Sequence, residues 1–187
     1  MPVVVNVGCG LDTRYQRLKD RTRARFYEFD LPDVIRTRRE LIGENEWDVC
    51  LAGSVLDTDW MDELKRREPG AKFIFIFEGV LMYFSKEQVS RILNNISLRF
   101  QGSELFVEMC DAQTAAWKDC DLLQSFDAKL KCGINHGQEL VRHVKGLEFI
   151  DQIRHSEVAP SRKYDMKEIG ALMRFRVNRR TVRNALS

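Results

Sequence analysis

Five short runs of apolar, β-branched and aromatic residues recur along the first 110 residues, and they constrain the fold more than any other feature. The runs are VVVNV (3–7), RFYEF (25–29), WDVCLA (47–52), KFIFIF (72–77) and ELFVEM (104–109). Several are nearly continuous rather than alternating in polarity, which is typical of parallel strands covered on both faces. The pattern therefore predicts parallel strands of one buried sheet.

Segments with recognisable helix ends separate these runs. Pro32 suits the first turn of a helix over 32–41, and Gly43 suits its end. Asp57 to Asp59 are expected to cap a shorter helix that ends at EPG (68–70).

The longest of these helices has the clearest start. Ser85 and Gln88 form a capping box, and the helix that they open reaches about Arg99. Strands and helices in repeated alternation predict an α/β fold. We expect a doubly wound, mostly parallel sheet with right-handed crossovers in three α/β/α layers.

The rhythm is less regular after Met109, where we expect mainly helices. The expected elements are a helix over 111–131, a short helix over 137–144, a strand over 147–153, a helix over 164–173 and a weak strand over 174–177. No internal repeat or flexible linker interrupts the chain, so one domain over 1–187 is expected.

Composition excludes several classes of protein. Apolar residues make up 44% of the 187 and charged residues 31%, as in ordinary globular proteins. Apolar stretches fall short of the ~20 residues that span a bilayer, and no secretion signal is recognisable, so a cytoplasmic protein without a membrane partner is expected. Five cysteines without a C-x-x-C pair and three scattered histidines give neither a disulfide framework nor a metal site.

Charge is distributed unevenly along the chain. The net charge is only +2, but from Arg162 onward eight basic residues face two acidic ones. Such a tail can bind nucleic acid. A solvated helix face is the favoured interpretation, because no aromatic residues are interleaved for stacking on bases.

The glycine-rich stretch NVGCGLDTR (6–14) directly follows the first expected strand. Ligands of open parallel sheets bind beyond the carboxyl ends of the strands, where Gly8 and Gly10 would lie. Glycines there allow a ligand to approach the main chain closely. Thr13 occupies the place of the third glycine of the dinucleotide fingerprint, so the loop alone leaves a binding site and a plain turn equally open.

Two acidic residues end neighbouring strands at the same expected edge. Asp30 lies about 20 residues after the loop, the distance at which a carboxylate meets ribose hydroxyls. Its alternative role is to cap the helix that begins at Pro32. Glu78 follows five apolar residues, and either a cationic ligand or a structural salt bridge would offset the cost of burying it.

Three segments, VVNVGCGLDTR, YEFDLPDVIRTRREL and IFEGVLMYF, stand in order within residues 3–100. Together they resemble the leucine carboxyl methyltransferase family, which includes O-methyltransferases of polyketide biosynthesis. The resemblance implies a Rossmann-like class I methyltransferase fold that uses S-adenosyl-L-methionine, with a cofactor-binding half (1–110) and an acceptor-side half (111–187). The family has a helical segment before the first strand, and the resemblance leads us to expect a version of the fold without it.

The resemblance also implies which residues bind the cofactor. They are Gly8, Gly10, Asp12, Arg14, Asp30, Leu31, Ser54, Val55 and Glu78. The two glycines would pass beneath the methionine part, and Asp30 would hold the ribose. The Ser-Val pair would flank the adenine, with Asp57 nearby, and Glu78 would face the methionine amino group or the sulfonium. For Arg14, an ion pair that supports the loop is an equally open interpretation.

The implied activity is O-methyl transfer to a small-molecule or polyketide-like acceptor, with Tyr83 as the residue that contacts it. A carboxylate acceptor is favoured, because it is ionised near neutral pH and no histidine is expected in the site as a general base. A phenolic hydroxyl and a peptide C-terminal carboxylate are the other acceptors considered. The alternatives are an NAD(P)-dependent oxidoreductase and a non-catalytic nucleoside-binding protein. An exposed apolar sheet face would favour a homo-oligomer.

Overall fold

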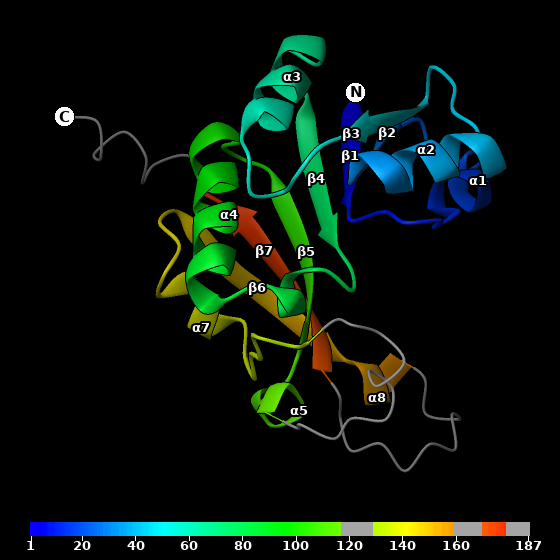
Figure 1. Ribbon diagram of the computed structural model, residues 1–187. Helices are drawn as coiled ribbons and strands as arrows, with labels where there is room; N and C mark the ends of the chain where they lie inside the picture. The colour runs from blue at the N-terminus through cyan, green and yellow to red at the C-terminus, as the bar shows by residue number, and fades with distance from the viewer. Residues whose placement is uncertain (117–128, 159–169, 179–187) are drawn as a thin grey trace.

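The computed structural model of the chain describes residues 1–116, 129–158 and 170–178 (Figure 1). These residues form a seven-stranded sheet in the order β3-β2-β1-β4-β5-β7-β6. The strands are β1 (Pro2–Val7), β2 (Arg25–Asp30), β3 (Asp48–Ala52), β4 (Lys72–Phe77), β5 (Glu104–Cys110), β6 (Leu147–Arg154) and β7 (Gly170–Val177). The first five pair in parallel, and β7 is antiparallel to both β5 and β6. The expected doubly wound, mostly parallel sheet is confirmed.

Helices connect the strands at nearly the predicted places. They are α1 (Arg14–Leu18), α2 (Pro32–Leu41), α3 (Asp59–Arg67), the short 3-10 helix η1 (Leu81–Tyr83), α4 (Lys86–Arg99), α5 (Ala112–Ala116), α7 (Gln138–Val141) and α8 (His155–Val158). The bounds of α2 match the prediction. The capping box of α4 is confirmed, with the Gln88 N–H donating to Ser85 Oγ and the Ser85 N–H donating to Gln88 Oε1.

Helices cover both faces of the sheet, as the contacts of β2 show. Phe26 and Phe29 lie three residues apart, so their side chains project to opposite faces. The ring of Tyr15 in α1 contacts Phe26 edge-on at 5.6 Å between centroids, and Trp60 in α3 stacks on Phe29 at 4.5 Å. These contacts establish the three α/β/α layers.

The two faces are packed differently. Buried phenylalanines of β4 and the Phe100 ring at the end of α4 pack together within the largest cluster of the core. On the opposite face, α2 inserts Ile35 between the buried thiols of Cys9 and Cys50. Both cysteines thus act as small apolar residues.

The start of α3 differs from the prediction. The residue that precedes the helix is Thr58, and it makes no side-chain capping bond. Asp59 lies within the first turn, and Asp57 takes part through its carbonyl, which accepts a bond from the Trp60 indole N–H at 3.0 Å. Asp57 and Asp59 therefore do not cap α3 with their carboxylates.

Two predicted helices in the second half need correction. Of the helix expected over 111–131, the described residues contain only α5, residues 129–131 are not helical, and 117–128 lie outside the described residues. The helix expected over 164–173 is wrong for residues 170–173, which belong to β7; residues 164–169 are not described. Pairing with strands on both sides overrides the local helical pattern there.

The expected strand over 174–177 is confirmed as the second part of β7, and the expected strand over 147–153 is β6. Within the basic tail, Arg174 and Arg176 are thus on a strand rather than a helix face, and both pair with Glu104 of β5. The other basic residues of the tail lie outside the described part. In that part, no helix has the length and apolar character needed to cross a bilayer.

Candidate functional site

A hollow of about 450 Å³ lies at the carboxyl ends of β1, β2, β3 and β4, where the strand order reverses direction. We call it the Asp30 hollow. It is lined by Val7, Gly8, Phe29, Asp30, Leu31, Gly53, Ser54, Val55, Gly79, Val80, Tyr83 and Phe84. Six of the ten predicted site residues are among them. This is the edge at which parallel α/β sheets bind their ligands.

The two glycines of the loop have different roles. Gly8 has φ +72°, and a Cβ there would come within 2.2 Å of Val80 Cγ2, so both the backbone angle and the packing require glycine. Gly10 has φ +50°, but a Cβ there would meet no atom within 4 Å. Gly10 therefore presents bare backbone to open space, which a ligand can approach.

Asp30 holds the loop against the end of β2. Its carboxylate accepts the Gly10 N–H at 2.8 Å and the Leu31 N–H at 2.7 Å. The residue that precedes α2 is Leu31 rather than Asp30, so Asp30 is not the helix cap. Each carboxylate oxygen has a second lone pair, and Asp30 can still accept bonds from a ligand in the hollow.

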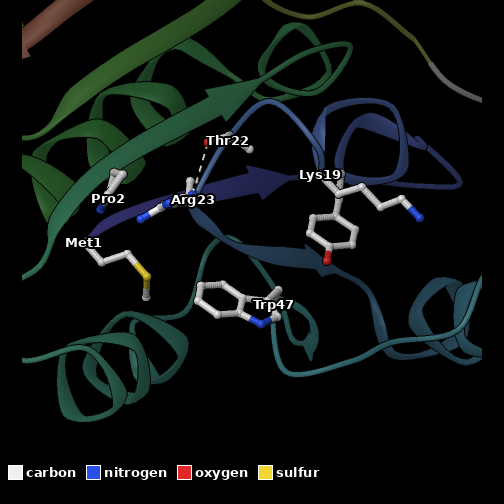
Figure 2. Close-up of a pocket in the computed structure, with 8 residues that line it drawn as sticks. Met1, Pro2, Lys19, Thr22, Arg23 and Trp47 are labelled. Atoms are coloured by element: carbon white, nitrogen blue, oxygen red, sulfur yellow. Dashed lines mark hydrogen bonds between the residues drawn. The ribbon is translucent and has the colours of Figure 1, made fainter.

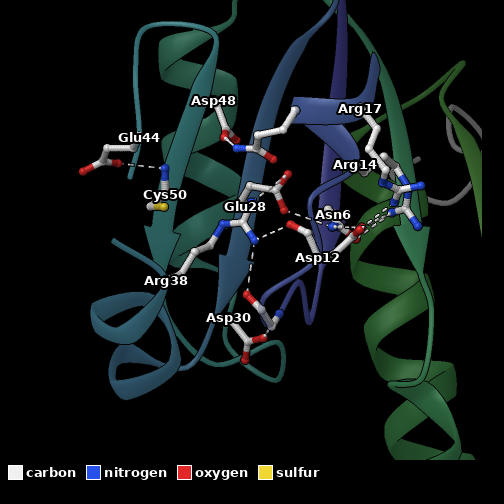
Figure 3. A network of polar contacts seen from close by, with 12 residues as sticks. Asn6, Asp12, Arg14, Arg17, Glu28, Asp30, Arg38, Glu44, Asp48 and Cys50 are labelled. Atoms are coloured by element: carbon white, nitrogen blue, oxygen red, sulfur yellow. Dashed lines mark hydrogen bonds and ion pairs between the residues drawn. The ribbon is translucent and has the colours of Figure 1, made fainter. Parts of the chain in front are cut away.

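Glu78 does not line the Asp30 hollow. Its carboxylate contacts the guanidinium of Arg14. Arg14 also pairs with Asp12 at 3.1 Å and donates to Asn6 Oδ1 at 3.1 Å (Figure 3). The structural interpretation of Arg14, an ion pair that supports the loop, is therefore what the geometry shows. The Glu78 side chain is 59% exposed, so its second oxygen remains accessible.

Beneath the loop lies a set of buried polar groups. Glu28 and Arg38 are both fully buried, and burial raises the pKa of Glu28 to about 7 although Arg38 and the Asn6 amide oppose the shift. Burial also raises the pKa of the Cys9 thiol, which makes this thiol unsuited to act as a nucleophile.

A histidine lies at the same edge of the sheet and is connected to the wall of the hollow through one glutamate. His155 Nε2 is 3.0 Å from Glu108 Oε1, and Glu108 Oε2 accepts the Gly79 N–H at 2.7 Å. Sequence reasoning missed both residues. Phe77 pairs with Val107, so Glu108 lies beside Glu78 at the ends of β4 and β5. The register of these two strands could therefore have indicated Glu108. His155 is the first residue of α8, a helix that the sequence analysis did not predict.

A larger hollow, of about 670 Å³, lies at the opposite edge of the sheet (Figure 2). Met1, Pro2, Arg23 and Trp47 line it, close to the residues where β1, β2 and β3 begin. It contains none of the predicted site residues. Ligands of parallel sheets bind at the other ends of the strands, so this hollow is not the candidate site.

Comparison with known proteins places the same region of the chain in one family. A leucine carboxyl methyltransferase profile matches residues 1–97, which is more than half of the chain. The tetracenomycin polyketide synthesis O-methyltransferase TcmP of Streptomyces glaucescens is 27% identical over 154 residues, covering 80% of this chain and 55% of TcmP. The chain thus spans about half the length of this relative.

Solved structures with the same fold are more distant in sequence. The N-methyltransferase NodS from Bradyrhizobium japonicum WM9 superposes with a TM-score of 0.59 at 13% identity, covering 95% of this chain and 86% of NodS. LepI in complex with SAM gives a TM-score of 0.63 at 16% identity, covering 95% of this chain and 43% of LepI. These similarities confirm the Rossmann-like class I methyltransferase fold.

Proposed function

The chain belongs to the leucine carboxyl methyltransferase family, and on that basis we propose that it binds S-adenosyl-L-methionine and transfers a methyl group to an oxygen of a small-molecule acceptor. One observation carries the proposal: Asp30, Ser54, Val55 and Tyr83 line a single hollow beside the loop of Gly8 and Gly10. The domain division, with a cofactor-binding half and an acceptor-side half, belongs to the same proposal.

The residues of the Asp30 hollow fit the cofactor. A nucleoside needs a hydrogen-bond acceptor for its ribose, an apolar wall for its base and a close approach to the main chain. Asp30 has lone pairs to spare, Val55 supplies apolar wall, and the space above Gly10 and Gly79 is open. When bound, the cofactor would supply an electrophilic methyl group on a positively charged sulfur.

The roles of this chain's residues follow from their positions. Asp30 would accept the ribose hydroxyls, and Ser54 and Val55 would flank the adenine. The free oxygen of Glu78, held in place by Arg14, would receive the methionine ammonium. Tyr83 also lines the hollow and would orient the acceptor. In-line displacement mainly requires that two reactants be positioned and water excluded.

The acceptor is proposed to be a carboxylate or a phenol of a polyketide-like molecule, and the similarity to TcmP supports this class. A carboxylate acceptor would need only to be positioned against the methyl group, since it is already ionised near neutral pH. A phenol must also lose its proton. The His155–Glu108 pair keeps a phenol among the acceptors, because His155 could take that proton while Glu108 stabilises the resulting imidazolium.

Calorimetry tests the cofactor. We expect S-adenosylhomocysteine to bind with micromolar affinity and Asp30→Ala to abolish the binding. Asp33→Ala is the matched control, because Asp33 is an exposed acid in the first turn of α2, three residues away. Binding of NAD but not of S-adenosylhomocysteine would establish the oxidoreductase alternative, and equal affinity in the Asp30→Ala variant would refute the assigned site.

A further inference from the structure

Arg38 extends from α2 to the inner side of the glycine loop. Its side chain is fully buried, and its Nη1 group donates to the carbonyl of Gly10 at 3.2 Å and to that of Asp12 at 2.6 Å (Figure 3). A buried guanidinium is costly unless its donors are used. Here one of its three nitrogens, Nη1, is used on two main-chain oxygens of the loop.

Gly10 is consequently held on both sides. Its N–H donates to Asp30, and its carbonyl accepts from Arg38. Glycine has little backbone preference of its own, so a loop built on it takes its shape from such external bonds. Because the Gly10 N–H also orients the Asp30 carboxylate, Arg38 acts on Asp30 through Gly10.

The ion pair behind Arg38 is a weak source of stability. Arg38 Nη2 lies 3.5 Å from Glu28 Oε1, and within the described part of the chain Arg38 Nε, Arg38 Nη2 and Glu28 Oε1 make no hydrogen bond. Buried pairs with such incomplete bonding can often be replaced by uncharged residues at little cost. Stability alone therefore gives little reason for an arginine at this position.

We propose that Arg38 is the positioning residue of the cofactor loop: it fixes the carbonyls of Gly10 and Asp12 and thereby presents the Asp30 carboxylate to the ribose. Glu28 balances the charge of Arg38, and Asn6 connects Glu28 to the Asp12 carboxylate through bonds of 2.9 and 3.1 Å. The inference rests on the proposed function for the ligand, whereas the hold on the loop can be tested without one.

The test separates loop geometry from folding. Arg38→Met alone leaves Glu28 buried without a counter-charge, and we expect it to lower the melting temperature at pH 8. Arg38→Met combined with Glu28→Gln removes both charges and is expected to recover most of that loss. In the double variant, S-adenosylhomocysteine should still bind about tenfold more weakly, and the Gly10 amide should exchange about tenfold faster, because the loop carbonyls have lost a charged donor.

Two further variants complete the design. Arg39→Met is the matched control: Arg39 is the next residue of α2, is 47% exposed and pairs with Glu44, so affinity and Gly10 exchange should stay unchanged. Arg38→Lys keeps the charge without the forked donor and should give intermediate values. If the double variant folds poorly, the affinity and the Gly10 exchange rate of Arg38→Lys alone test the inference.

Wild-type affinity and wild-type Gly10 exchange in the double variant, or in Arg38→Lys when that variant decides, would overturn the inference. Failure of the proposed function is distinguishable from this result. If the wild-type protein does not bind S-adenosylhomocysteine, the assigned cofactor is wrong, and the Gly10 exchange rates alone decide whether Arg38 shapes the loop.

Discussion

At the β1–β2–β3 end of the sheet, Asp30 and Arg38 bond to the main chain beside the hollow, whereas at the β5–β7–β6 end His155 bonds to another side chain. Asp30 accepts two backbone N–H groups, and Arg38 donates to two backbone carbonyls. At the other end, His155 contacts the Glu108 carboxylate, and both side chains are partly exposed.

This difference separates two kinds of recognition surface. At the first end, the two side chains hold the backbone of the loop at Gly10 from both sides, which restricts its geometry. A pair of partly exposed side chains can exchange partners when a ligand arrives. Under the proposed function, the first end suits a ligand of constant shape, the cofactor, and the second, which we call the acceptor end, suits the acceptor.

The strongest test of this difference is a substitution at Gly8, because the loop at the first end is argued to be rigid. We expect Gly8→Ala to lower the free energy of unfolding by about 4 kcal/mol, since it combines a positive φ with severe overpacking against Val80. Chemical denaturation measures the change. Gly8→Ala with Val80→Ala should recover the packing part only, and a stability of Gly8→Ala within 1 kcal/mol of wild type would show that the loop is less rigid than argued.

The pH dependence of stability tests the buried charges of the same end. Burial raises the pKa of Glu28 to about 7, against the opposing effect of Arg38. The folded protein therefore holds a proton that the unfolded chain has lost, so stability falls as pH rises from about 4.5 to 7 and is level above that. The contribution is at most roughly 3 kcal/mol.

Burial also raises the pKa of nearby Asp48, which adds to the slope with the same sign. Denaturation across this pH range should therefore show a shallower slope in Glu28→Gln than in the wild-type protein. An identical slope in the two proteins would mean that Glu28 is ionised throughout.

A substitution at His155 sharpens the comparison at the acceptor end. With a phenolic acceptor, His155→Gln should reduce kcat on the order of a hundredfold, because the group that takes the proton is lost. With a carboxylate acceptor the rate should be unchanged, because no proton is transferred. Methyl-transfer assays with paired phenol and carboxylate substrates decide, and His143→Gln is the control for loss of an imidazole.

The smallest expected effect comes from the link between α4 and the acceptor end. Asn94 donates to the carbonyl of His143 at 2.9 Å and accepts the Lys145 N–H at 3.0 Å. Asn94→Ala should cost about 1 kcal/mol and speed amide exchange at Lys145, while the Gly10 amide stays protected. Faster exchange at both positions would mean that the two ends open together.

Local sequence signals were sufficient for most of the first half of the fold. Pro32 and the capping box of Ser85 and Gln88 mark helix starts within a few residues, and near-continuous apolar runs mark buried strands. β7 was predicted only in part, because its first residues are held in place by β5 and β6, which lie far away in the chain.

The candidate site was predictable where residues stand at strand ends, as for Asp30 and Ser54. Arg38 was not, since the stretch RTRRE offers three arginines of similar local context. The sequence distinguishes Arg38 only by its spacing: it lies three residues after buried Ile35, on the same face of α2. His155 depends on how β6 ends, which no short-range pattern reveals.

The loop's dependence on a single helical side chain also limits how the protein can be altered. Each residue added to an α-helix turns everything beyond it by about 100°. One inserted residue between Pro32 and Arg38 would swing the guanidinium away from Gly10, although most of α2 is exposed. A deletion or insertion scan through this surface helix should therefore reveal an intolerance to length that its water-facing residues, substituted one at a time, do not share.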